Sequence, residues 1–122
     1  MASAQAGKGL SVVKPSPSFE IDSKFDAGIG QLTVVGELDM ATVPLLEEQV
    51  RAMLARTVQE LTIDLRKLSF LDSSGLRLLI ILRDRAAAEG WTLGVVRPSG
   101  QALSILSLTG ADENLPFVED DG

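Results

Sequence analysis

The order of hydrophobic and polar residues predicts a β-hairpin in the first part of the chain. Phe19, Ile21 and Phe25 alternate with charged or polar neighbours, which is typical of a strand that buries one face and exposes the other. Residues 26–28 predict a turn, because Asp and Gly suit the backbone angles of turns. The apolar segment at residues 31–35 then predicts the returning strand.

Three later segments have the spacing of helices that bury one face. Thr42 is positioned to cap the first of them, and Pro44 falls in its first turn, where proline is tolerated. Gly90 and Gly110 follow the other two helices and are expected to end them in the left-handed conformation. The predicted helices cover residues 43–54, 73–89 and 101–108.

Short apolar segments between these helices predict further strands, at residues 61–65, 91–96 and 115–118. The residues at 36–39 and 69–71 are interpreted as loops. Strand and helix alternate from residue 31 onward, which favours parallel strands joined by helical crossovers. We therefore expect an α/β fold: a mixed, mostly parallel sheet of four to five strands with an N-terminal hairpin and three to four helices.

The composition indicates one folded domain with short extensions. A chain of 122 residues corresponds to a single domain. Residues 1–18 are rich in Ala, Ser, Gly and Pro without periodicity and are expected to form a flexible tail. The domain is expected to cover residues 19–118, and residues 119–122 to form an acidic, solvated end.

Charge and residue content exclude several classes of function. The net charge of −6 argues against a general nucleic-acid binder. No apolar segment is long enough to span a membrane, and no signal-peptide core is visible, so a cytoplasmic protein is expected. The chain has no Cys, His or Tyr, which excludes thiolate zinc sites and a Ser-His-Asp triad. We expect no cofactor and no metal, and the case for an enzyme is weak.

The segment from Asp72 to Leu76 carries the strongest candidate site. It reads Asp-Ser-Ser-Gly-Leu and lies where a loop meets the second helix. Ser and Asp at a helix start usually cap the free backbone N–H groups. The same place also favours negative charge, so an exposed Ser73 is well placed to carry a phosphate.

Three features in this order resemble the STAS domain, and most closely the bacterial anti-sigma factor antagonists. They are Gly36-Glu37-Leu38-Asp39, the segment from Leu68 to Leu76, and Leu108-Thr109-Gly110. The resemblance covers about residues 19–118. It implies a protein that binds an anti-sigma factor, which is also an ATP-dependent serine kinase, and thereby releases a sigma factor.

The same resemblance implies that the kinase phosphorylates Ser73, with Ser74 as a secondary site, and that a serine phosphatase reverses the reaction. Asp72 is expected to bind a backbone amide, to orient Ser73, or to touch the magnesium ion of the kinase's ATP. The expected partner-binding surface consists of Glu37, Asp39, Asp72, Ser74, Gly75, Arg77 and Ile81. The resemblance favours a contact role for Glu37 and Asp39 over that of solvated loop charges, whereas the apolar spacing of the helix places Ile81 with Arg77 on a binding rim. Many close relatives carry a small residue at the position of Arg77, which leaves the identity of the partner open.

Two other functions stay open. One is a STAS adaptor subunit of a transport or signalling assembly that is not phosphorylated. The other is a minimal enzyme with Ser73 as nucleophile, although no imidazole is present to take its proton. Without a feature that demands an oligomer, we expect a monomer.

Overall fold

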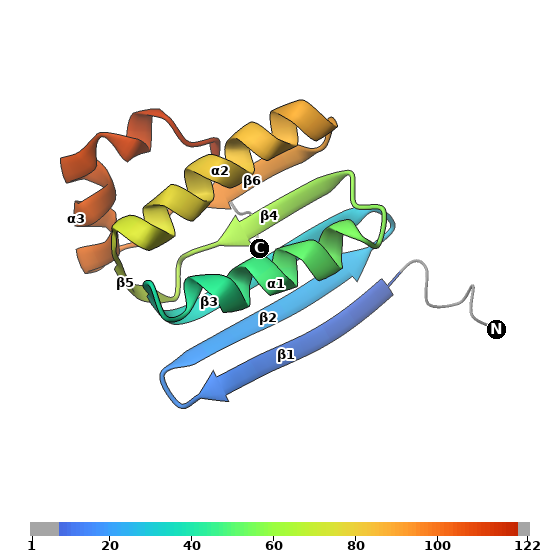
Figure 1. The fold of residues 1–122 in the computed structure, drawn as a ribbon, viewed down its shortest axis with the longest axis horizontal. Coiled ribbons are helices and arrows are strands. Elements are labelled where there is room, and N and C mark those ends of the chain that lie inside the picture. The colour runs from blue at the N-terminus through green and yellow to red at the C-terminus, as the bar shows by residue number, and fades with distance from the viewer. Residues whose placement is uncertain (1–7, 120–122) are drawn as a thin grey trace.

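The structure is a computed structural model that describes residues 8–119 (Figure 1). Its elements are, in chain order, β1 (Lys8–Ser16), β2 (Phe19–Asp26), β3 (Ile29–Leu38), α1 (Val43–Leu54), β4 (Glu60–Asp64), β5 (Leu68–Leu71), α2 (Ser73–Glu89), β6 (Thr92–Val96), α3 (Gly100–Thr109), a 3₁₀ turn η2 (Ala111–Glu113) and β7 (Phe117–Val118). Helices and strands alternate after β3 as the pattern of the sequence predicts, except that β5 follows β4 without a helix between them.

The strands form one mixed sheet of seven strands. Strands β1, β2 and β3 pair antiparallel, whereas β4, β6 and β7 follow in parallel in the order β3-β4-β6-β7. Strand β5 pairs in parallel with the end of β3 instead of with β4. The sheet therefore has a larger antiparallel part and more strands than the four to five that we predicted.

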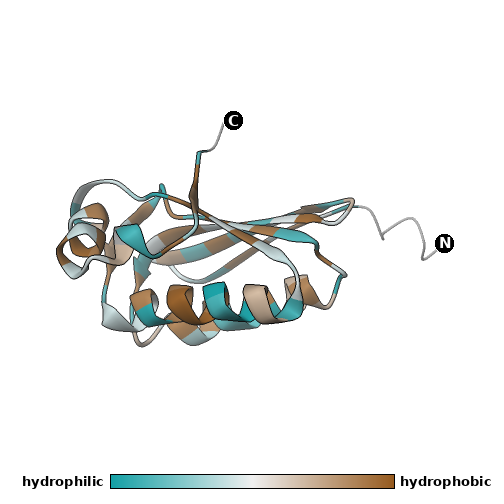
Figure 2. Cartoon of the chain, turned by 90° about the horizontal axis from the view of Figure 1, so that it is seen from above, coloured by the Kyte–Doolittle hydropathy of each residue, from teal (hydrophilic) through white to brown (hydrophobic). Residues whose placement is uncertain are grey.

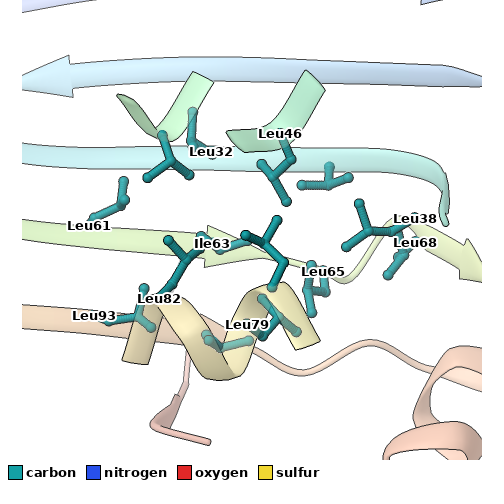
Figure 3. Packing of buried hydrophobic residues seen from close by; sticks show 14 of the residues in the cluster. Leu32, Leu38, Leu46, Leu61, Ile63, Leu65, Leu68, Leu79, Leu82 and Leu93 are labelled. Carbon is teal, nitrogen blue, oxygen red and sulfur yellow. The ribbon is translucent and has the colours of Figure 1, made fainter. Parts of the chain in front are cut away.

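The two long helices α1 and α2 lie on the same side of the sheet (Figures 1 and 2). They bury the apolar residues that face them from the strands, and Figure 3 shows Leu46, Leu79 and Leu82 directed toward Leu32, Ile63 and Leu65. The predicted buried face of α1 is confirmed, because Leu46, Val50 and Met53 are buried. Helices α2 and α3 end at Gly90 and Gly110, both left-handed, also as predicted.

The predicted flexible tail is wrong for residues 8–16, which form β1 and pair antiparallel with β2. The register shifts between Val13 and Ser16, and this irregularity places Pro15 where its missing N–H is tolerated. The sequence of β1 does not alternate regularly between apolar and polar residues, and most of its side chains are exposed. The strand is therefore held mainly by backbone pairing with β2. Residues 1–7, and residues 120–122 of the predicted acidic end, lie outside the described part.

The predicted loop at 36–39 is partly wrong, because β3 continues to Leu38 and pairs there with β5. The predicted loop at 69–71 is β5 itself. Gly36 makes this extension possible: its φ is +107°, and a Cβ at this position would lie 1.9 Å from the carbonyl oxygen of Ser18. A side chain at this position would therefore collide with the turn that joins β1 and β2.

The described residues, 8–119, contain no helix that combines the length and the apolar character needed to cross a bilayer.

Candidate functional site

The candidate site lies where β5 ends and α2 begins. Asp72 separates the two elements and is the N-cap of α2, with an extended backbone. Its Oδ1 atom accepts hydrogen bonds from the backbone N–H groups of Ser74, at 2.8 Å, and Gly75, at 3.1 Å. Of the three roles considered for Asp72, binding a backbone amide is the one that these contacts show.

Ser73 is the first residue of α2, and its side chain is exposed. Its hydroxyl forms no hydrogen bond with any of residues 8–119. Of the Ser and Asp side chains that were candidates for capping, only that of Asp72 caps the helix, and Ser74 takes part through its backbone N–H. The hydroxyl of Ser73 has no part in holding the helix start, which leaves it available for chemistry with another molecule.

The start of α2 is packed tightly against the sheet at Gly75, which is buried. A Cβ at this position would lie 2.6 Å from Cδ1 of Leu71 and 2.9 Å from Cγ of Leu38. Real Cβ atoms do not approach other heavy atoms this closely. Gly75 therefore allows the helix end to reach the sheet, and it fixes the depth at which the neighbouring Ser73 stands above the surface.

A second loop borders this helix start, between β3 and α1. Asp39 Oδ1 accepts hydrogen bonds from the backbone N–H groups of Ala41, at 2.9 Å, and Thr42, at 3.1 Å. The hydroxyl of Thr42 donates to the carbonyl oxygen of Glu37, at 2.8 Å. Thr42 occupies the cap position of α1 as predicted, but its side chain does not cap the helix. Asp39 is therefore a turn-forming residue, whereas the side chain of Glu37 is exposed.

The loop and the helix start are tied together through the sheet. The backbone N–H of Asp72 donates to the carbonyl oxygen of Leu38, at 3.1 Å, directly beyond the register pair of Leu38 and Leu71. Because of this link and the pairing of β3 with β5, the residues around Glu37 and the residues around Ser73 lie next to one another at one edge of the sheet. The structure thus brings together the two segments that the sequence places more than thirty residues apart.

An open groove of about 340 Å³ runs between α1 and α2 beside this edge. Ile81 and Met40 are its most exposed apolar residues, with 46% and 77% of their surface accessible. The full lining is Met40, Val43, Pro44, Glu47, Ser74, Arg77, Leu78 and Ile81. Leu78 is buried, whereas Ile81 is exposed, as is Arg77. Met40 was missed by the sequence analysis, although a large apolar residue in a polar loop is a usable signal.

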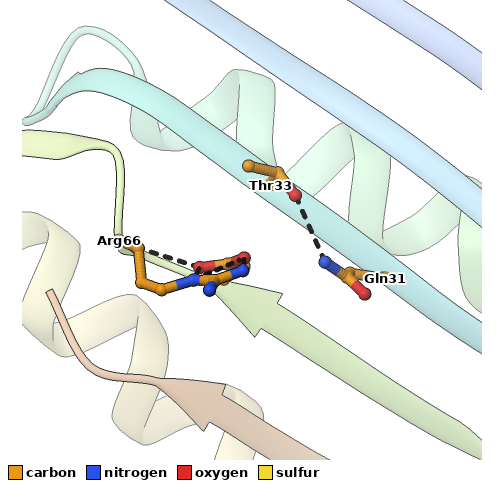
Figure 4. Close-up of polar contacts among 4 residues, drawn as sticks. Gln31, Thr33 and Arg66 are labelled. Carbon is orange, nitrogen blue, oxygen red and sulfur yellow. Dashed lines mark hydrogen bonds and ion pairs between the residues drawn. The ribbon is translucent and has the colours of Figure 1, made fainter. Parts of the chain in front are cut away.

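One buried carboxylate belongs to the sheet and not to this edge. Asp64, at the end of β4, is 2% exposed and forms hydrogen bonds and an ion pair with Arg66, with an N–O distance of 2.7 Å (Figure 4). Burial would raise the pKa of Asp64, but the hydrogen bonds and charge of Arg66 outweigh it and lower the pKa below its ordinary value. The pair satisfies a buried charge and is therefore structural.

Residues 8–119 contain no group of three or more acidic, His or Cys side chains that is arranged to hold a metal ion. The chemistry of the site therefore rests on one exposed hydroxyl, a capped helix start and an adjoining apolar groove. An exposed hydroxyl without an adjacent base is a poor nucleophile on its own. Such an arrangement is suited to modification by another protein and to docking.

Comparisons with known proteins agree with this description. A family model described as "Mlab, STAS domain" matches residues 22–119. The chain is 30% identical over 86 residues to the anti-sigma-F factor antagonist RsfB of Mycobacterium tuberculosis, and the alignment covers 70% of each protein. It is 29% identical to an anti-sigma factor antagonist from Mycobacterium paratuberculosis whose crystal structure is known, with a TM-score of 0.66 over 96% of this chain and 90% of that one. The unphosphorylated form of the anti-sigma factor antagonist SpoIIAA shares the fold, with a TM-score of 0.63, 16% identity, and coverage of 92% and 88%.

Proposed function

Because this chain belongs to the STAS-domain family, we propose that it acts as an anti-sigma factor antagonist switched by phosphorylation of Ser73. In the unphosphorylated form it binds an anti-sigma factor that is also a serine kinase, and the sigma factor is released. The names of its relatives support the general role. The observation that carries the site is the exposed, unbonded hydroxyl of Ser73 at the first position of α2.

The chemistry assigned to this chain is that of a substrate. The Ser73 oxygen attacks the γ-phosphorus of ATP held by the kinase, the bond to ADP breaks, and the hydroxyl proton passes to a base on the kinase. A serine phosphatase reverses the change by hydrolysis, which releases inorganic phosphate. The protein itself is not an enzyme in this scheme, needs no cofactor, and works in the cytoplasm as a monomer.

Phosphorylation acts on docking because of the charge it adds. A phosphoserine carries about −1.5 to −2 charges at neutral pH, next to the carboxylate of Asp72. The exposed Glu37 adds negative charge on the neighbouring sheet edge. Like charges forced together in an interface cost several kcal/mol, whereas the same phosphate on the free protein stays in water. The modification is therefore expected to prevent association and to leave the fold intact.

We assign the docking surface to the sheet edge and the adjoining groove. The surface follows the edge and then continues along α2. Its residues are Glu37, Asp39, Asp72, Ser74 and Gly75 at the edge, and Arg77 and Ile81 on the helix. Gly75 contributes only its backbone and its small size, because it is buried. The apolar groove beside Ile81 gives a partner side chain a place to exclude water, which is where binding energy concentrates in interfaces.

The test uses Ser73→Ala and Ser73→Glu with candidate ATP-binding anti-sigma kinases. We expect Ser73→Ala to bind the kinase and to accept no phosphate on the peptide from Lys67 to Arg77, as read by mass spectrometry. Ser73→Glu should lose binding and keep its circular-dichroism spectrum. Ser107→Glu is the matched control, because Ser107 is an exposed serine on α3 and adds the same charge elsewhere.

Three outcomes would contradict the proposal. Phosphate on the Ser73→Ala protein would move the site to Ser74, and loss of binding by the control would make the effect one of net charge. Unfolding of Ser73→Glu would place the effect in the fold and not in the interface.

A further inference from the structure

Arg77 is an exposed cation on α2 that is unpaired among the residues that the structure describes. It forms no ion pair or hydrogen bond with any other residue in the described range 8–119. On the same helix, Arg83 and Arg85 each form an ion pair with a carboxylate, at 2.9 Å. The guanidinium of Arg77 is therefore available for an anion.

The helix geometry directs Arg77 toward Ser73. Residues four apart lie on the same face of a helix, with their Cβ atoms about 5–6 Å apart. Side chains tilt toward the N-terminus of the helix, so the long side chain of Arg77 is able to reach the turn that holds Ser73. Arg77 lines the groove next to Ser74, the residue that follows Ser73. A negative residue that precedes a positive one by four positions is also the favourable order for such a pair.

We infer that Arg77 binds the phosphate group of phosphorylated Ser73 within the same chain. The inference rests on the proposed function, because it needs a phosphate at that position. The planar guanidinium offers a fork of N–H donors that matches two phosphate oxygens. Phosphorylation then changes the docking surface twice: it adds a dianion, and it withdraws a guanidinium that a partner carboxylate could otherwise bind.

Other charged groups around the helix start also affect the second pKa of a phosphate on Ser73. Asp72 lies on the same turn with its carboxylate engaged in the cap. The other charged groups on the elements packed around the site lie at the end of β3, on α1 and before β5. They are Glu37 and Asp39, Glu47, Glu48 and Arg51, Lys67, and Arg66 in its pair with Asp64. Their sum is negative and raises the second pKa of the phosphate. They are the same in every variant, so a difference between variants isolates the contribution of residue 77.

The test installs phosphoserine at position 73 during translation, so that no kinase is needed. The second pKa of the phosphate, near 6 for a free phosphoserine, is measured by phosphorus NMR in the native sequence and in Arg77→Gln, Arg77→Lys and Arg85→Gln. We expect Arg77→Gln to raise this pKa by about half a unit, Arg77→Lys to lie between, and Arg85→Gln to match the native sequence. The difference should shrink in about 0.5 M salt because the pair is exposed.

An equal phosphate pKa in the native sequence and Arg77→Gln would overturn the inference, and so would an equal effect of Arg85→Gln. Neither result would touch the proposed function, because the phosphate is introduced without the kinase. Conversely, a kinase that leaves Ser73 unmodified would end the proposed function while this titration still reports whether Arg77 holds the phosphate.

Discussion

Replacing Asp72 tests the physical basis of the candidate site. Its carboxylate accepts two backbone hydrogen bonds at the start of α2, at 2.8 and 3.1 Å. Asp72→Ala removes both acceptor contacts, and Asp72→Asn keeps an acceptor of the same shape without the charge. The two variants therefore separate the hydrogen bonds of the cap from its electrostatic interaction with the helix.

The magnitude follows from the role of the residue. Loss of an N-cap side chain costs about 0.5–2 kcal/mol, and a charged acceptor with two donors belongs in the upper part of this range. We expect Asp72→Ala to lower the free energy of unfolding by about 1–2 kcal/mol. Asp72→Asn loses only the interaction with the helix dipole, about 0.3–1 kcal/mol. For a chain of this length, about 3–5 °C of melting temperature corresponds to each kcal/mol.

Urea unfolding followed by circular dichroism measures these differences, with Asp84→Ala as the control. Asp84 is an exposed acid on the same helix, with 67% of its side chain accessible, and its replacement should not change the midpoint measurably. The reasoning is refuted if Asp72→Asn is as unstable as Asp72→Ala, because the geometry of the cap would then not be what stabilises the helix start. An unchanged midpoint for Asp72→Ala would refute it as well.

The remaining predictions concern the buried ion pair of the sheet and the packing beneath the site. Arg66→Gln should lower the free energy of unfolding by about 1–3 kcal/mol at neutral pH, because it removes the guanidinium hydrogen bonds to the buried Asp64. Because the pKa of Asp64 is lowered in the fold, its contribution is present above the unfolded pKa and is lost as the pH falls through the folded value. The gap between Arg66→Gln and the native sequence should therefore close below the ordinary aspartate range, and a constant gap in urea titrations would contradict this. Gly75→Ala should destabilise by about 1 kcal/mol, since overpacking costs about 1–3 kcal/mol and the better helix propensity of Ala returns about 1 kcal/mol; a more stable variant would show that the contact with Leu38 is loose.

The elements that the sequence predicts correctly are those marked by the spacing of apolar side chains or by a glycine at a helix end. Helix α1 shows its buried face in the spacing of Leu46, Val50 and Met53, and Gly90 marks the end of α2. Strands β1 and β5 were missed because their pairing depends on the backbone. The nine residues of β1 are mostly exposed and include Pro15, and β5 has only four residues.

At the candidate site, the sequence predicts that Ser73 lies at the start of α2, but not which of the neighbouring side chains caps the helix. Asp, Ser and Ser are all good caps, so composition alone does not show which of the three residues caps α2. The backbone of Asp72 decides this, because it is extended and comes directly before the first helical residue. Asp39 gives a second example, since its hydrogen bonds to the following loop depend on a turn that its residue type merely permits.

The separation of capping from modification has an evolutionary consequence. Because the side chain of Asp72 caps the helix start, the fold does not depend on the side chain at position 73. Substitutions there can abolish, mimic or restore the proposed regulation in a single step, without compensating changes elsewhere. A lineage could thus lose control by a kinase and keep an intact scaffold for other assemblies.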